Sequence, residues 1–146
     1  DAAFSSGVEV RIDGFSVTGI QEVAISRDDV TLYWVDNSES KLHAATMFDL
    51  RAFTDSRDVS TIPVSEIVLS ADELTLYYTQ SGLDILMATR ASTADAFDTG
   101  VPVPNVNSPD LDAPVYITAD DCVLYLKSTR PGGFGGYDIW EARRPR

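Results

Sequence analysis

The sequence predicts an all-β fold built from three similar four-stranded units, and three observations support this prediction. One nine-residue pattern occurs three times, as SRDDVTLYW at 26–34, SADELTLYY at 70–78 and TADDCVLYL at 118–126. Each occurrence has an Ala-Phe pair before it and a short apolar segment after it. No segment places apolar residues at the 3.6-residue period of a capped helix. Short strands separated by turn residues therefore describe the chain better than helices do.

The spacing of the repeat indicates what the units build. The Ala-Phe pairs are Ala3-Phe4, Ala52-Phe53 and Ala96-Phe97. Successive phenylalanines lie about 45 to 50 residues apart, which is typical of β-propeller blades. We therefore expect a single domain over 1–146, with blades at about 4–50, 53–95 and 97–146.

Each unit is expected to hold an outer strand d, an inner strand a, and then strands b and c. In chain order these are d at 7–12 and 100–106; a at 21–25, 65–69 and 113–117; b at 30–35, 74–79 and 122–127; and c at 41–46, 84–89 and 138–143. Strand b is apolar at nearly every position. Because side chains alternate along a strand, Leu76 and Tyr78 are expected to point to one face and Thr75 and Tyr77 to the other. A strand buried on both faces has this pattern, which a blade packed between two other blades requires. Tyr33, Tyr77 and Tyr125 repeat at one position of this strand, which favours packing between blades.

The repeated unit Ser-x-Asp-x-x-Thr-Leu-Tyr and the segment STRPGGFGGYDIWEAR at 128–143 resemble the WD-like repeats of the TolB-type six-bladed β-propellers. The resemblance covers essentially the whole chain, and the third copy is the closest match. The family usually has glycine in the turn after the Asp, where this chain has Asp29, Glu73 and Asp121. Because glutamate tolerates positive φ less well than Asp, we expect the middle turn to differ in geometry. The resemblance implies a non-enzymatic interaction scaffold of the bacterial periplasm or of the cell exterior.

Three blades cannot enclose a channel, because closed propellers have four to eight. The first strand, within residues 1–12, is able to complete the C-terminal blade of a second chain, so two chains would form a six-bladed homodimer. The chain begins at Asp1 rather than Met, which indicates a processed or excised product. The alternative is therefore that it is half of a longer six-bladed protein.

Composition excludes several function classes. The net charge is −12, and the 11 basic residues are scattered among 23 acidic ones, so no nucleic acid partner is expected. No apolar run reaches about 18 residues, so no membrane insertion is expected. Cys122 is the only cysteine, and its apolar neighbours predict a buried, inert thiol. His43 is the only histidine and aligns with Leu86 and Trp140, which favours a packed or rim side chain over a catalytic one.

Loop lengths indicate where a ligand would bind. The a–b turns have constant length, whereas the d–a and b–c connections vary and should emerge together on the opposite, top face. Glu22 and Glu66 lie early in strand a, which lines the channel. They are expected either to form part of a hydrated acidic funnel or to act as the acid pair of a glycosidase. Arg130 and Phe134 in the Gly-rich b–c loop are the other candidate ligand contacts. Asp138 and Asp84 start strand c and are expected to bond local backbone.

The segment NVNSPDLD at 105–112 clusters oxygen donors, which makes Asp110 and Asp112 weak calcium candidates and Asp112 a candidate ligand contact. A plain loop is the alternative, and no cofactor is expected. Three hypotheses for function remain open. The preferred one is a non-enzymatic module that binds a protein, peptide or small ligand at the top face. The others are a carbohydrate-active or other hydrolase that uses channel carboxylates, and a structural half-propeller that only assembles with its missing half.

Overall fold

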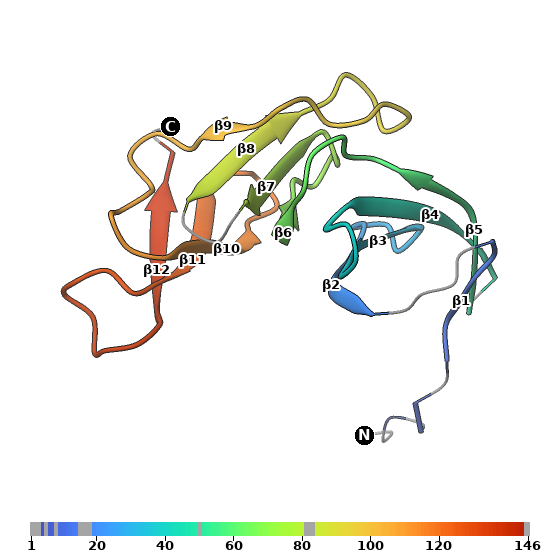
Figure 1. Ribbon diagram of the computed structural model, residues 1–146, viewed down its shortest axis with the longest axis horizontal. Coiled ribbons are helices and arrows are strands. Elements are labelled where there is room, and N and C mark those ends of the chain that lie inside the picture. The colour runs from blue at the N-terminus through green and yellow to red at the C-terminus, as the bar shows by residue number, and fades with distance from the viewer. Residues whose placement is uncertain are drawn as a thin grey trace.

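The computed structural model describes residues 4, 6–7, 9–14, 19–49, 51–80 and 84–144. These residues form twelve strands in three sheets and contain no helix. Accordingly, no helix in this part of the chain is long and apolar enough to cross a membrane. The three sheets follow one another side by side like propeller blades (Figure 1), which confirms the predicted fold class.

The first sheet contains five strands in the order β2, β3, β4, β5, β1. Their bounds are β1 Arg11–Ile12, β2 Ile20–Ile25, β3 Thr31–Asp36, β4 Leu42–Asp49 and β5 Ala52–Asp58. Strands β2 to β5 are antiparallel neighbours, and β1 adds to β5 in parallel. The pairing of Arg11 and Ile12 with β5 places this part of the expected first strand on the first sheet. Its exchange into a second chain stays a prediction.

The second sheet is β6 Ser65–Leu69, β7 Thr75–Thr79, β8 Ile85–Thr89 and β9 Val101–Pro102. The third is β10 Asp112–Ile117, β11 Val123–Ser128 and β12 Asp138–Arg143, with no outer strand among the described residues. The outer strands β5 and β9 pair with strand c of the preceding sequence unit. Each sheet is therefore offset by one strand from the sequence unit that we delimited.

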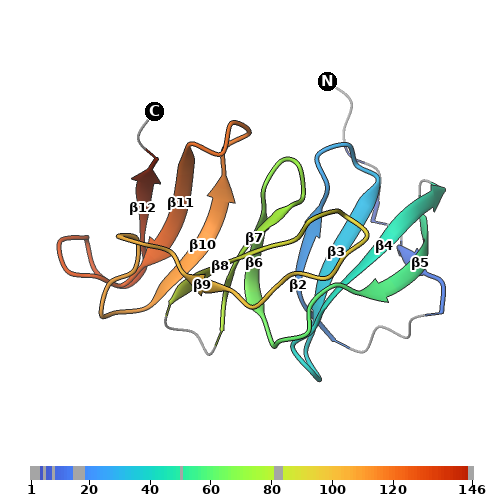
Figure 2. The same cartoon turned by 90° about the horizontal axis from the view of Figure 1, so that it is seen from above.

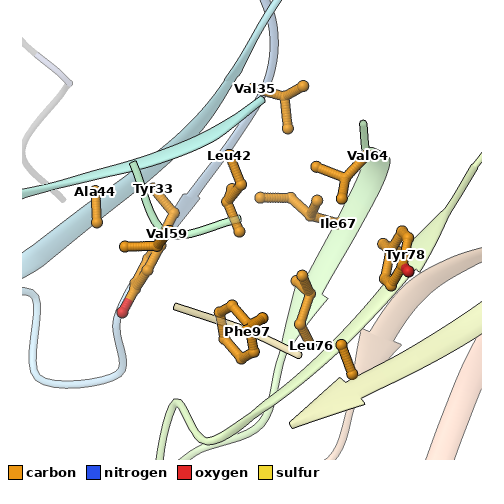
Figure 3. Packing of buried hydrophobic residues seen from close by; sticks show 11 residues of the cluster. Tyr33, Val35, Leu42, Ala44, Val59, Val64, Ile67, Leu76, Tyr78 and Phe97 are labelled. Atoms are coloured by element: carbon orange, nitrogen blue, oxygen red, sulfur yellow. The ribbon is translucent and has the colours of Figure 1, made fainter. Parts of the chain in front are cut away.

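The core lies between the sheets. One cluster joins the first and second sheets and includes Tyr33, Leu76 and Tyr78 (Figure 3). A second cluster joins the second and third sheets and includes Tyr77, Ile85 and Leu126. Strand β7 thus buries Leu76 and Tyr78 on one side and Tyr77 on the other, which confirms the two-sided pattern predicted from sequence.

The three a–b turns have one geometry. In the middle turn, the hydroxyl of Ser70 donates to Asp72 and accepts a bond from the Thr75 amide, and equivalent bonds occur in the other two turns. The prediction for Glu73 was wrong, because its φ of 62° equals that of Asp29 and is close to the 53° of Asp121. The side-chain bonds of the neighbouring Ser and Asp hold the turn, so the residue at positive φ adapts to it.

The two ends of the sheets differ. The three a–b turns lie together at the upper edge in Figure 2, and we call this edge the turn end. The b–c and d–a connections lie at the opposite edge, which we call the loop end. The loop end corresponds to the top face of the sequence prediction.

Candidate functional site

Each inner strand has a β-bulge close to its loop end. The register shifts lie between Ile20 and Glu22, between Ser65 and Val68, and between Pro114 and Tyr116. In the second bulge Glu66 has a φ of 47°, in the left-handed region that glutamate rarely adopts. Bulges re-aim side chains and are common beside functional sites. The same irregularity in all three sheets therefore marks this end as a candidate site.

The predicted candidates Glu22 and Glu66 lie close together here, and Lys127 joins them from the third sheet. The Glu66 carboxylate lies 2.5 Å from the Lys127 ammonium through Oε1 and accepts a 3.0 Å hydrogen bond from Thr79 Oγ1 through Oε2. The single Thr79 hydroxyl proton is shared between Glu66 and the Ser65 carbonyl, which lies 3.1 Å away. Both Glu66 oxygens are thus held by groups on neighbouring strands.

The charges of this cluster influence one another. Partial burial raises the pKa of Glu22, the Glu66 carboxylate raises it further, and Lys127 opposes both effects. The hydrogen bond to Glu66 raises the pKa of Lys127. We name Glu22, Glu66 and Lys127 the loop-end triad. It carries two carboxylates and one ammonium, and it draws one residue from each of the three sheets.

Sequence reasoning missed Lys127, although a signal existed. Lys127 aligns with Val35 and Thr79, two residues after the repeated tyrosine, so it is the one charged residue at that position. In the third sheet the residue that aligns with Glu22 and Glu66 is Pro114. The third sheet therefore contributes a cation from strand b where the other two contribute an anion from strand a.

One aromatic residue of the long b–c loop, Tyr137, lies beside this cluster. The Lys127 ammonium is 5.5 Å from the centre of the Tyr137 ring, and Phe134 is fully exposed further along the loop. The Phe134 and Gly135 amides donate to Asp138 Oδ2, so Asp138 bonds local backbone as predicted. Gly133 is needed because a Cβ there would lie 1.9 Å from Asp138 Oδ2.

Arg130 and Asp112 form an internal ion pair. Arg130 Nη2 lies 2.6 Å from Asp112 Oδ1 and donates to the Val106 carbonyl, and the guanidinium lies 5.4 Å from the Trp140 ring centre. Burial alone would raise the pKa of Asp112, but hydrogen bonds from Arg130, Ser128 and Ser108 hold it below its usual range. These contacts fix the d–a connection, which leaves Arg130 and Asp112 little capacity for a ligand.

Asn107 and Ser108, two further polar residues of segment 105–112, are also engaged. Asn107 accepts a bond from the Ile85 amide and donates to the Ile85 carbonyl, which caps the edge of β8. Asp112 Oδ2 accepts bonds from the amide and hydroxyl of Ser108. Asp110 is half-buried nearby. Among the described residues no group of three or more His, Cys, Asp or Glu could hold a metal ion.

His43 is buried, as the alignment with Leu86 and Trp140 predicted, but it lies between two carboxylates that sequence reasoning missed. Its Nε2 is 2.7 Å from Asp36 and its Nδ1 is 2.9 Å from Asp58, while the ring stacks on Trp34 at 5.3 Å. Burial alone would raise the pKa of Asp36, but hydrogen bonds from His43 and from Ser38 and Glu39 lower it strongly. This group lies in strands β3, β4 and β5 and is structural.

The prediction of a buried Cys122 was wrong. The thiol is half-buried and lines an open cavity between the second and third sheets. Its apolar neighbours Val123 and Leu124 belong to β11, whereas Cys122 lies just before the strand, where the outer part of the interface is not covered.

The chain matches no protein-family model and no curated protein to which it was compared.

Proposed function

We propose that this chain is a non-enzymatic β-propeller binding module that assembles into a six-bladed ring and takes its ligand at the loop end. The observation that carries the proposal is the convergence of Glu22, Glu66 and Lys127 from three separate sheets. The TolB-type resemblance supports the same class of function. Variable loops on a fixed scaffold are the usual place for binding.

The charge of the triad favours a ligand with a cationic group. Its two carboxylates outnumber its one ammonium, and Glu66 is already paired with Lys127. A ligand ammonium or guanidinium placed beside Glu22 would relieve the cost of holding a partly buried carboxylate near Glu66. The exposed ring of Tyr137 offers a cation a second favourable contact. The net charge of −12 attracts the same class of ligand. We therefore propose a basic peptide or protein segment.

One observation favours the hydrolase alternative. A carboxyl with a raised pKa beside a second, ion-paired carboxylate resembles the arrangement of a glycosidase acid and its partner. Against it, Glu66 pairs with Lys127 through one oxygen and accepts a hydrogen bond from Thr79 through the other, and these contacts hold its charge in place and weaken it as a nucleophile.

Calorimetric titration with tetralysine tests the binding proposal. We expect Glu22→Gln to weaken binding about tenfold, because one good charge contact contributes roughly 1.4 kcal/mol. Asp29→Asn removes the same charge from the exposed a–b turn of the first sheet, at the turn end and away from the triad, and should leave the affinity nearly unchanged. An equal loss in both variants would contradict a specific site and indicate general charge attraction. Tetraglutamate should not bind.

The hydrolase alternative has its own readout. Hydrolysis of nitrophenyl glycosides by the unaltered chain, abolished by Glu22→Gln with the fold retained, would replace the binding proposal with the enzymatic one.

A further inference from the structure

Phe97 fills the space between the first and second sheets. It is 3% exposed, its amide donates to the Val59 carbonyl at 2.9 Å, and Ser60 pairs with it as an isolated bridge. The Arg90 guanidinium lies 4.4 Å from the centre of its ring and donates to the Tyr33 hydroxyl at 2.7 Å. Phe97 thus enters from the segment that leads into β9 and anchors the outer strand of the second sheet.

The second and third sheets repeat this arrangement without the phenylalanine. Arg144 aligns with Arg90 and donates to the hydroxyl of Tyr77, which aligns with Tyr33. Beside this pair is an open cavity of about 520 Å³. No outer strand pairs with β12 among the described residues.

The walls of the cavity correspond to the walls around Phe97. Six of the residues that line the cavity align with residues of the preceding repeat. Those aligned residues pack with Phe97 in the core between the first and second sheets or stack on its ring. In each pair the cavity residue comes first: Tyr77 and Tyr33, Met87 and Ala44, Val103 and Val59, Leu124 and Leu76, Ala142 and Ala88, Arg144 and Arg90. The cavity is therefore lined by the same kinds of position that surround Phe97.

The sequence contains a second copy of the segment that delivers Phe97. Residues 96–103 read AFDTGVPV and residues 3–10 read AFSSGVEV, so alanine, phenylalanine, glycine and both valines occupy the same places. Phe4 is fully exposed. A fully exposed phenylalanine in a segment of this pattern is complementary to a cavity that lacks one.

The segment cannot reach the cavity of its own chain. It leads into β1, which pairs with β5 on the first sheet, whereas the cavity lies between the second and third sheets. Figure 1 shows the two termini at separate parts of the molecule, with the sheets between them. The segment of this sequence that matches the cavity is therefore able to fill it from a second copy of the chain.

We infer that residues 3–10 of a second copy form the missing outer strand of the third sheet and place Phe4 in the cavity beside Arg144. The pairing of Val101 with Met87 and of Pro102 with Leu86 fixes the register. In this register Glu9 of the second copy lies opposite Trp140, and the Phe4 amide donates to the Val103 carbonyl. Two copies make two such contacts about a two-fold axis. The inference shares ring assembly with the proposed function and is independent of the ligand.

Light scattering over a concentration series tests the inference. The unaltered chain should reach twice the 15.9 kDa of one copy. Phe4→Ala should raise the dissociation constant at least ~100-fold, because each dimer loses two buried phenylalanine side chains. Phe48→Ala, at an exposed phenylalanine of β4, is the matched control and should leave the mass unchanged. A monomeric unaltered chain, or equal dissociation constants for the Phe4→Ala and unaltered chains, would overturn the inference.

Peptide competition gives a second readout that does not depend on how a variant folds. Excess peptide of residues 1–12 should convert the dimer of unaltered chains to monomers, and the same peptide with Phe4→Ala should not. Failure of both peptides to dissociate the dimer would overturn the inference. Because neither assay involves tetralysine, failure here and failure of the ligand proposal are distinguishable.

Discussion

The second and third sheets share strands a, b and c but differ in their surroundings. Ile85 and Ile139 occupy the same position of strand c, yet Ile85 is fully buried and Ile139 is 66% exposed. The second sheet has a neighbour on each face, whereas the third has one on a single face and leaves Tyr116 and Ile139 exposed. The comparison teaches that the burial of a repeated position depends on the next sheet and is not encoded in the repeat itself.

The largest expected effect compares these two isoleucines. Ile85→Ala should lower the free energy of unfolding by about 3 kcal/mol, because it leaves a cavity in a packed core. Ile139→Ala should change it by less than about 0.5 kcal/mol in the monomer. Urea denaturation at low protein concentration measures both. Equal losses would contradict the difference in burial.

The second test concerns the arginine that follows strand c. Arg90 is 5% exposed and donates to the carbonyls of Glu73, Thr93 and Asp95. Arg90→Met should cost about 2–3 kcal/mol, because three carbonyls and the Tyr33 hydroxyl lose the buried guanidinium as their donor.

Arg144 is exposed at the equivalent position, and Arg144→Met should cost less than about 1 kcal/mol in the monomer. Thermal unfolding monitored by circular dichroism ranks the two variants. An Arg144→Met loss as large as that of Arg90→Met would show that both interfaces are equally complete.

A third test uses the tyrosine of strand b. Tyr33 donates to Glu73 and accepts from Arg90, and burial together with Glu73 raises its pKa to about 12. Tyr33→Phe should cost about 1–2 kcal/mol at neutral pH. Because the folded pKa lies above the usual 10, ionisation destabilises the fold, and the stabilising contribution of Tyr33 should disappear as the pH rises from 10 to about 12.

Stability curves at pH 8 to 12 for the unaltered and Tyr33→Phe chains measure this effect. Tyr125→Phe, at the same position of the third sheet, should have little effect at neutral pH in the monomer, because no following sheet of the same chain covers it among the described residues. A constant gap between the Tyr33→Phe and unaltered chains up to pH 12 would contradict the expected titration.

The smallest expected effect is at the loop-end triad. Since the folded state raises the pKa of Glu22, ionised Glu22 opposes folding above the usual pKa of about 4.5. Glu22→Gln should therefore stabilise the chain at pH 7 by less than about 1 kcal/mol, because solvent screens this partly exposed group. The gain should vanish below about pH 4. A loss of stability at pH 7 would show that Glu22 makes a favourable ion pair instead.

Sequence reasoning succeeded where the physical cause is local. The repeated Ser/Thr-x-Asp turn, the strands that flank it and the two faces of β7 were all predictable from segments of about nine residues. It failed at Glu73, because glutamate was judged by its backbone preference while the side-chain bonds of Ser70 and Asp72 hold the turn. It also failed at Cys122, because apolar neighbours do not show whether an interface is complete.

The candidate site was predictable only in part. Repetition pointed to Glu22 and Glu66, but the pairing of Glu66 with Lys127 joins residues in different sheets. Arg130 and Asp112 looked like ligand contacts, yet they bond each other across a connection that sequence reasoning could not fold.

By itself the sequence determined the three repeated units, their turns and the alternation of side chains along each strand. The reason is that hydrogen bonds within a turn and the two-residue period of a strand depend on neighbours in the chain. Only the tertiary structure decided which faces are covered, which charges meet and where a cavity stays open. Those features depend on contacts between sheets, and equivalent residues such as Ile85 and Ile139 therefore meet different environments.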